Sequence, residues 1–217
     1  MTRSLTIDFV SDVMCPWCVI GLHSLLQALE KLDGEVSATI RFRPFELAPD
    51  MPAEGEEVIP HLMAKYGISA EQVRQNQARV TELGKAVGFR FNFQTDSRKW
   101  NTFDPHRLLH WAGEQSADYQ LALKQALFDA YFTQNLNPSD RSLLCELAAR
   151  VGLDPEEAAA VYDSGRYTDE VRAEEVLWRQ RDITSVPAVV FNERYLVSGG
   201  QPVETFVQVM QEVAAEI

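Results

Sequence analysis

The sequence predicts an α/β fold in which a large all-helical segment is inserted between the second strand and a C-terminal hairpin. An apolar alternating run near the N-terminus leads into a Cys-x-x-Cys helix and a second strand. A hairpin and a last helix close the chain, and helix signals dominate the long region between these parts. We therefore expect one α/β unit built from residues 1–53 and 181–217, and a helical insertion over residues 54–180.

The N-terminal part is expected to form strand, helix and strand. Apolar residues alternate with polar ones over residues 5–10, which predicts the first strand. Cys15-Pro16-Trp17-Cys18 follows, and Pro16 suits the first helical position because its missing N–H has no helical partner there. An apolar stripe at helical spacing continues over residues 22–32. A second strand is expected over residues 38–43.

The middle of the chain carries several helix boundaries. A capping box at Ser69–Gln72 predicts a helix that stops at Gly88. Further helix starts are expected at Asp104-Pro105, at Asn137–Asp140 and at Asp154-Pro155. These boundaries support the helical insertion.

The C-terminal part is expected to form a hairpin and a helix. Residues 187–192 and 195–198 have the composition of two short strands joined by a tight turn. Gly199-Gly200-Gln201-Pro202 breaks the chain sharply, and apolar residues at helical spacing follow from Val203. Strand, Cys-x-x-Cys helix, strand, hairpin and last helix follow one another in the thioredoxin order.

Cys15 and Cys18 are the candidate catalytic residues. A Cys-x-x-Cys pair at a strand-to-helix junction lowers the pKa of a thiol and lets its thiolate attack a disulfide. The first sulfur meets the unpaired N–H groups and the positive end of the helix dipole, and the second lies one turn further along. Such exchange needs no nucleotide, flavin or metal cofactor, because the two sulfurs carry the electrons. Half of a zinc site is the alternative, but no second ligand pair stands at metal spacing.

Val186 and Pro187 begin the hairpin. A proline that opens a strand beside a redox pair fits a cis X–Pro bond, which would leave the Val186 backbone free to pair with an extended substrate. An ordinary trans proline on an edge strand is the alternative. The candidate substrate-binding residues are Pro16, Trp17, Val186 and Pro187, with Trp17 at the exposed rim.

These features together resemble the DsbA-like thioredoxin-fold oxidoreductases over essentially the whole chain. Ser11-Asp12-Val13, Asn101–His106 and Gly199–Pro202 resemble the cytoplasmic FrnE type within that superfamily. The resemblance implies that Cys15 is the exposed nucleophile and Cys18 the resolving thiol that releases the mixed disulfide. It also implies that Pro187 is the cis-proline, preceded by Val186, which shapes substrate contact.

Two departures from the DsbA pattern qualify these expectations. Trp17 stands where periplasmic DsbA has a histidine, so we expect a Cys15 pKa below that of a free thiol but less extreme than the DsbA value of about 3.5. Some FrnE-type proteins carry a second cysteine pair near the C-terminus, but no cysteine follows Cys145 here, so a second-disulfide relay is not expected.

The other polar residues allow two interpretations each. Asp12 could accept a proton from Cys18 during resolution, or could bind backbone N–H groups in its turn. Asp8 is expected to be structural, and Cys145 to be a buried small hydrophobic residue. His106 and His110 share a helix face, a spacing that can bind metal, but without a third ligand a packing or capping role is expected. From the resemblance, the segment 101–106 is expected at most to line the cleft beside the active site.

Composition limits the partners and the location. The net charge of −12 argues against nucleic-acid and anionic-membrane partners. No run is long enough to span a membrane, and Asp8 and Asp12 interrupt what would be a signal-peptide core, so a cytoplasmic location is expected. The expected partners are protein or small-molecule thiols and disulfides, glutathione among them. The oligomeric state and the direction of exchange are left open, although a reducing cytosol favours reductase or isomerase activity.

Two other functions fit the sequence. One is a glutathione-dependent transferase or isomerase of the kappa or hydroxychromene-carboxylate isomerase type, whose members resemble this chain in their helical insertion. Those enzymes usually have a serine where Cys15 stands, so the intact cysteine pair argues against this function. The other is a peptide-binding, chaperone-like module in which the insertion supplies an apolar groove.

Overall fold

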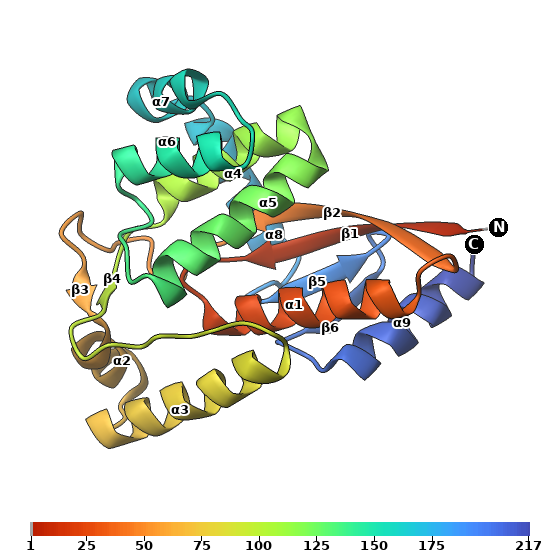
Figure 1. Cartoon of the computed structure of the whole chain (residues 1–217), viewed down its shortest axis with the longest axis horizontal. Coiled ribbons are helices and arrows are strands. Elements are labelled where there is room, and N and C mark those ends of the chain that lie inside the picture. Colours follow the sequence, from red (N-terminus) through yellow and green to blue (C-terminus); the bar gives the residue numbers. More distant parts are fainter. Residues whose placement is uncertain (1) are drawn as a thin grey trace.

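A four-stranded sheet with helices on both sides forms the centre of the computed structural model, which describes residues 2–217 (Figure 1). The strand order is β2-β1-β5-β6. Strand β1 (Arg3–Ser11) runs parallel to β2 (Val36–Pro44) and antiparallel to β5 (Ala188–Phe191), which in turn pairs with β6 (Tyr195–Ser198). This is the sheet of the thioredoxin fold, so the predicted fold class is confirmed.

Helix α1 (Pro16–Lys31) connects the two parallel strands, which need such a crossover. Helix α9 (Val203–Ala215) packs beside α1 below the sheet in Figure 1. Leu22 and Leu25 of α1 are fully buried, and the Phe191 and Phe206 rings lie 6.4 Å apart where α9 meets β5. The predicted apolar stripes therefore face the sheet, and they fix the start of α1 against the ends of β1 and β5.

The insertion is helical, as predicted, apart from one detail. Its elements are α2 (Val58–Tyr66), α3 (Ala70–Ala86), α4 (Phe103–Gln115), α5 (Ala117–Phe128), a π-helix η1 (Asp129–Thr133), α6 (Arg141–Arg150), α7 (Pro155–Ser164) and α8 (Thr168–Gln180). The detail is a two-residue antiparallel ladder between β3 (Glu56–Glu57) and β4 (Arg98–Lys99). The Arg98 guanidinium donates to the Glu54 and Gly55 carbonyls at 2.9 Å and holds the two segments together. Two residues per strand are too few to show a periodic pattern in the sequence.

Most helix boundaries in the insertion lie where the sequence predicts them. Ser69 and Gln72 make both hydrogen bonds of the capping box before α3. Asp140 and Asp154 cap α6 and α7 through their side chains. Helix α4 begins one residue before Asp104, because Asn101 rather than Asp104 accepts the first free N–H, that of Phe103, at 2.9 Å.

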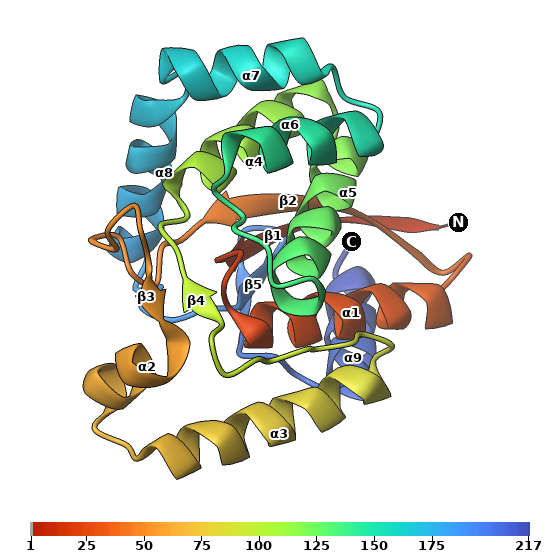
Figure 2. The same ribbon diagram turned by 60° about the vertical axis from the view of Figure 1, so that its left-hand side comes forward.

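The insertion helices form two groups on either side of the sheet (Figure 2). Helices α4 to α8 lie above the sheet, where α4, α5 and α8 contact β2. Helices α2 and α3 lie below, where α3 contacts α1. The β1–α1 junction lies between the two groups, and the division of the chain into two domains remains a prediction. Within residues 2–217, no helix combines the length and apolar character needed to cross a bilayer.

Candidate active site

Cys15 and Cys18 lie at the start of α1. Cys15 is the N-cap residue, and its carbonyl accepts the Cys18 N–H at 3.0 Å. Both thiols are free. The Cys15 thiol donates to the Val186 carbonyl, with Sγ and O 3.6 Å apart. The fold thus brings the Cys15 sulfur to Val186, two residues before β5, although about 170 residues separate them in the chain.

The two thiols differ in their tendency to ionise. Burial opposes the ionisation of Cys15, but hydrogen bonds from the Cys18 thiol and N–H, together with the charge of Lys99, outweigh it, so the pKa of Cys15 lies below that of an ordinary thiol. Burial and the adjacent Cys15 sulfur raise the pKa of Cys18 well above the ordinary value. Cys15 is therefore the thiol that ionises more readily and Cys18 the one that holds its proton more tightly, as a nucleophile and a resolving thiol require.

The predicted exposure of Cys15 is wrong. Only 3% of Cys15 is exposed, whereas Trp17 is 36% exposed. The reason is that Cys15 faces a cleft of about 810 Å³ between the insertion and the sheet and not the outer surface. The lining of this cleft includes Met14, Trp17, Leu62, Lys65, Lys99 and Val186. A substrate would reach the Cys15 sulfur through this cleft.

Asp12 is buried beside the sulfurs and holds the surrounding loops. Its carboxylate accepts the N–H groups of Met14 at 3.3 Å and Leu47 at 2.8 Å, and His106 Nε2 lies 3.7 Å away. Burial alone would raise the pKa of Asp12, but His106, the Leu47 N–H and Lys99 lower it to about 2. So acidic a carboxylate is a poor proton acceptor, which favours the backbone-binding interpretation over the catalytic one.

The Gly199–Pro202 segment fixes the position of the Cys-x-x-Cys motif. A β-carbon on Gly200 would lie 2.8 Å from the Trp17 carbonyl oxygen, so only glycine permits this approach. Next to it, the Gly199 N–H donates to the Pro187 carbonyl at 2.8 Å. The sequence motif therefore joins Trp17 to the Pro187 side of the site.

A Gly200→Ala variant is expected to lose about 1–3 kcal/mol of stability, because the new methyl group overpacks against the Trp17 backbone. The displaced start of α1 should also change the alkylation rate of Cys15. Urea unfolding and iodoacetamide labelling measure the two effects. Ser198→Ala, on the exposed side of the same hairpin, is the matched control and should stay within about 0.5 kcal/mol. Equal stability of Gly200→Ala and wild type would contradict the contact.

Asp8 and the two α4 histidines have structural partners. Asp8 accepts from Arg41 and Arg43 at 2.7 Å each, across the β1–β2 pair, as the structural interpretation predicts. His106 Nε2 lies 3.2 Å from the Phe45 carbonyl, whereas His110 faces Glu114 and Glu174. The two histidines therefore contact different groups, although they lie on the same helix.

Two expectations about the insertion need correction. The segment 101–106 does not line the cleft: Asn101 donates to the Pro49 and Met51 carbonyls at 3.2 and 3.4 Å, which fastens the insertion to the loop after β2. Cys145 is half-buried on α6 and not fully buried, because it stands at the edge of the apolar stripe that Leu144 and Leu147 bury.

Sequence reasoning missed three buried charged residues in and around the site. Lys99, Lys124 and Glu46 are buried, and neither Lys99 nor Glu46 belongs to any motif. For Lys124 a signal exists. It falls at helical spacing with Gln120, Leu123 and Leu127, so it occupies the buried stripe of α5.

The chain was compared with known families and structures. Residues 6–211 match the family model described as DSBA-like thioredoxin domain. A probable DsbA oxidoreductase from Streptomyces coelicolor is 34% identical, with a TM-score of 0.88 over 98% of this chain and 91% of that one. A 2-hydroxychromene-2-carboxylate isomerase is 16% identical, with a TM-score of 0.70 over 97% of each chain. The cytosolic disulfide reductase DsbM from Pseudomonas aeruginosa, solved with GSH, is 17% identical, with a TM-score of 0.66 over 96% of this chain and 98% of that one. Identities of 16% and 17% establish a common fold alone.

Proposed function

This chain belongs to the family of DSBA-like thioredoxin domains, and on that premise we propose that it is a thiol–disulfide oxidoreductase acting through Cys15 and Cys18. The observation that carries the proposal is the asymmetry of the two thiols. A thiol of lowered pKa faces the cleft, and a thiol of raised pKa lies one turn behind it. Its substrates are protein or small-molecule thiols and disulfides.

In the reductive direction, the Cys15 thiolate attacks one sulfur of a substrate disulfide. A bond forms between Cys15 and that sulfur, the substrate S–S bond breaks, and the other sulfur leaves as a thiolate. Cys18 then loses its proton and attacks the Cys15 sulfur, which releases the second substrate sulfur as a thiolate. The enzyme ends as the Cys15–Cys18 disulfide, oxidised by two electrons, and the substrate gains two electrons. The released substrate thiolates take up protons from water, to which the Cys18 proton is lost.

Val186, Pro187, Pro16 and Trp17 form the substrate-facing edge in this proposal. The Val186–Pro187 peptide bond is cis. Val186, Pro16 and Trp17 line the same cleft as Cys15. An extended peptide that lies along Val186 would present its disulfide to Cys15, a form of recognition in which a strand is added to a sheet edge.

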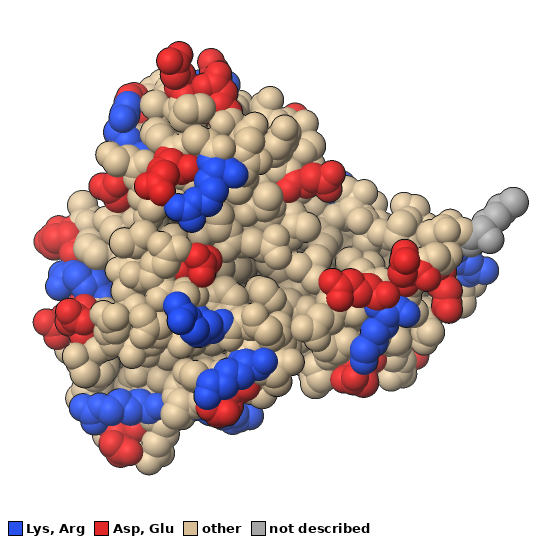
Figure 3. All heavy atoms as spheres, viewed as in Figure 1, with Lys and Arg blue, Asp and Glu red and all other residues tan. Residues whose placement is uncertain are grey.

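Glutathione is the small thiol partner that the cleft suits. Lys65, Arg79 and Lys99 bring positive charge to the cleft, which could bind the two carboxylates of this tripeptide. On the face shown in Figure 3, basic side chains form small separate groups, most of them beside acidic ones. The fold neighbour DsbM is described as a cytosolic disulfide reductase and was solved with GSH. We propose by analogy a cytoplasmic reductase or isomerase of the FrnE type, since the cytosolic glutathione pool would keep the pair mainly reduced.

Equilibration of the protein with glutathione buffers of graded ratio tests the proposal. Alkylation and mass measurement should show a reversible two-electron titration of Cys15 and Cys18. The Cys15 pKa, followed by thiolate absorbance, should lie below that of a free thiol. A pair that no buffer ratio changes would refute the proposed function. A potential well above the cytosolic range of about −220 to −320 mV would refute only the reductive direction.

A further inference from the structure

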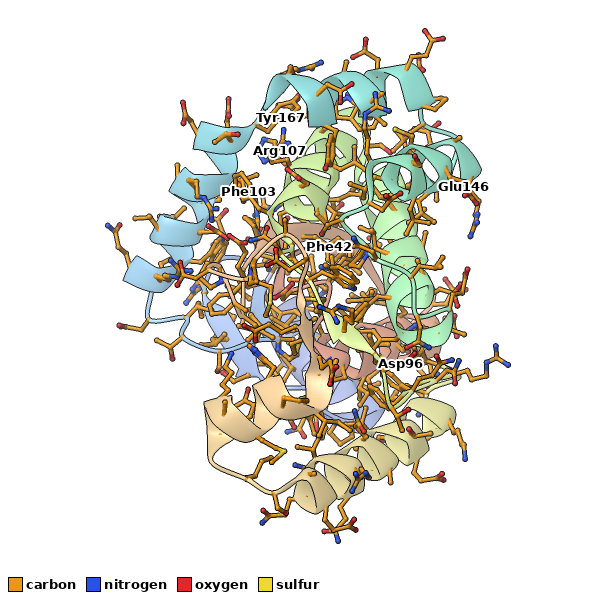
Figure 4. All side chains as sticks on the ribbon, turned by 90° about the vertical axis from the view of Figure 1, so that its left-hand side faces the viewer. Phe42, Asp96, Phe103, Arg107, Glu146 and Tyr167 are labelled. Atoms are coloured by element: carbon orange, nitrogen blue, oxygen red, sulfur yellow. The ribbon has the colours of Figure 1, made fainter. Side chains whose placement is uncertain are left out.

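Lys124 is a fully buried lysine on α5 with no hydrogen-bond partner among residues 2–217. Its Nζ lies over the rings of Phe42 and Phe128, 5.7 and 5.0 Å from their centroids. Figure 4 places Phe42 in the centre of the molecule, between the sheet and the insertion. A buried ammonium without a partner is strongly unfavourable, so its charge needs a compensating group.

The helix that carries Lys124 is fixed against the sheet. The Gln120 side chain accepts the Phe42 N–H at 2.8 Å and donates to the Phe42 carbonyl at 3.2 Å. Gln120 also donates to the Leu109 carbonyl at 3.0 Å, which ties α5 to α4. Lys124 lies one turn further along α5, so these bonds hold its backbone against the sheet.

The charges around Lys124 do not balance while both thiols are protonated. Cys18, Asp12 and Cys15 are the groups that act on the Lys124 charge. Arg43, His106 and His110 border the same small cavity as Lys124, and Lys99 acts on Asp12 and Cys15. Arg43 is already paired with Asp8 and Glu174. Two lysines against the single Asp12 carboxylate leave one positive charge, which one thiolate neutralises.

We propose that Lys124 is the buried counter-ion of the dithiol and that it promotes the ionisation of Cys18 when the mixed disulfide is resolved. This inference rests on the proposed function and assigns a part of it to the insertion. Lys124 makes no hydrogen bond to the sulfurs, so it is a positioning residue that acts through its charge.

In the mixed disulfide Cys15 is bonded to the substrate and carries no charge, so Cys18 becomes the thiol that Lys124 can stabilise as an anion. A solvent base takes the Cys18 proton, and the Cys18 thiolate attacks Cys15. The Cys15–Cys18 bond forms as the bond between Cys15 and the substrate breaks, and the substrate sulfur leaves with the electron pair. Burial lowers the pKa of Lys124 to about 8, against the opposing effect of Cys18, so the ammonium is still the main form at neutral pH.

A Lys124→Met variant tests the proposal, because methionine keeps an unbranched chain and removes the charge. Oxidised glutathione serves as the probe, and acid quenching with mass measurement follows formation and decay of the Cys15 mixed disulfide as a function of pH. We expect the variant to form the mixed disulfide and to resolve it about tenfold more slowly for each unit by which the Cys18 pKa rises. Leu123→Ala, a fully buried neighbour on the same helix, is the structural control and should leave the pH midpoint of resolution unchanged.

A resolution profile of Lys124→Met with the wild-type midpoint would overturn the role of Lys124 and leave the proposed function intact. A wild-type protein that forms no mixed disulfide would overturn both. A second measurement needs no variant: the Lys124 pKa, followed by NMR in the wild type, should be higher in the reduced than in the oxidised protein, because reduction returns the thiolate. An equal Lys124 pKa in the two forms would also overturn the proposal.

Discussion

A Cys15→Ser variant is expected to lose thiol–disulfide exchange by about a thousandfold or more, because a serine hydroxyl is not ionised at neutral pH and no other thiol faces the cleft. A Cys18→Ser variant is expected to stop after the first step. Its Cys15 thiolate can still attack a substrate disulfide, but no thiol follows to release the product, so the mixed disulfide accumulates.

Incubation with oxidised glutathione and with a disulfide-bonded protein, followed by intact mass measurement, checks both variants. Cys18→Ser should carry one adduct, on Cys15, and Cys15→Ser none. Cys145→Ser is the matched control, since Cys145 lies on α6 outside the cleft lining, and it should complete both steps. Absence of an adduct on Cys18→Ser, or full activity of Cys15→Ser, would contradict the assignment.

The same variants separate the other two functions. A glutathione transferase or isomerase needs only the first thiol position, so its activity would survive Cys18→Ser. A peptide-binding module would suppress aggregation equally well after substitution of both cysteines, with no redox activity in the wild type. Trapping of a mixed disulfide on Cys15 is expected only of the oxidoreductase.

The strands and the redox helix could be predicted from the sequence because each carries its own local signal. Apolar side chains on β1 meet apolar partners on β2, as in the pairs Ile7–Ile40 and Phe9–Phe42, so alternation within each strand already describes the buried face. The two cysteines and Pro187 likewise belong to short motifs. For the strands, the local pattern agrees with the structure because the alternating apolar residues are the ones that form the core.

The charged environment of the sulfurs could not be predicted in the same way. Lys99 lies on β4 and Lys124 on α5, and Asp12 is the only nearby charge within the motif region. Their effect on Cys15 depends on how the insertion packs on β2, which no spacing along the chain encodes. The cleft that buries Cys15 also depends on this packing. Long-range contacts therefore determine the electrostatics of the site, whereas a local motif determines which residues supply its two sulfurs.

Glu46→Gln is expected to change how the stability of the protein depends on pH. Glu46 lines the cleft, and its side chain is fully buried beside that of Glu175. Arg172 donates to both carboxyl groups, but one oxygen of each has no hydrogen-bond partner in residues 2–217. Burial and the negative charge of Glu175 raise the pKa of Glu46 to about 7. Near neutral pH a large fraction of the folded protein therefore holds a proton on Glu46 that an unfolded chain would release.

The sign of the effect follows from this shift. A folded pKa above the ordinary value of 4.5 means that the folded protein binds the proton more tightly, so the contribution of Glu46 to stability is full below about pH 4.5 and is lost as the pH rises through about 7. The loss amounts to about 3 kcal/mol at most. Glutamine does not ionise, so Glu46→Gln should remove this decline in urea unfolding between about pH 5 and about pH 8. The exposed Glu57→Gln on β3 should keep the wild-type slope. A wild-type stability that does not fall over this range, or an equal fall in Glu46→Gln, would show that the pKa of Glu46 is not raised in the folded protein.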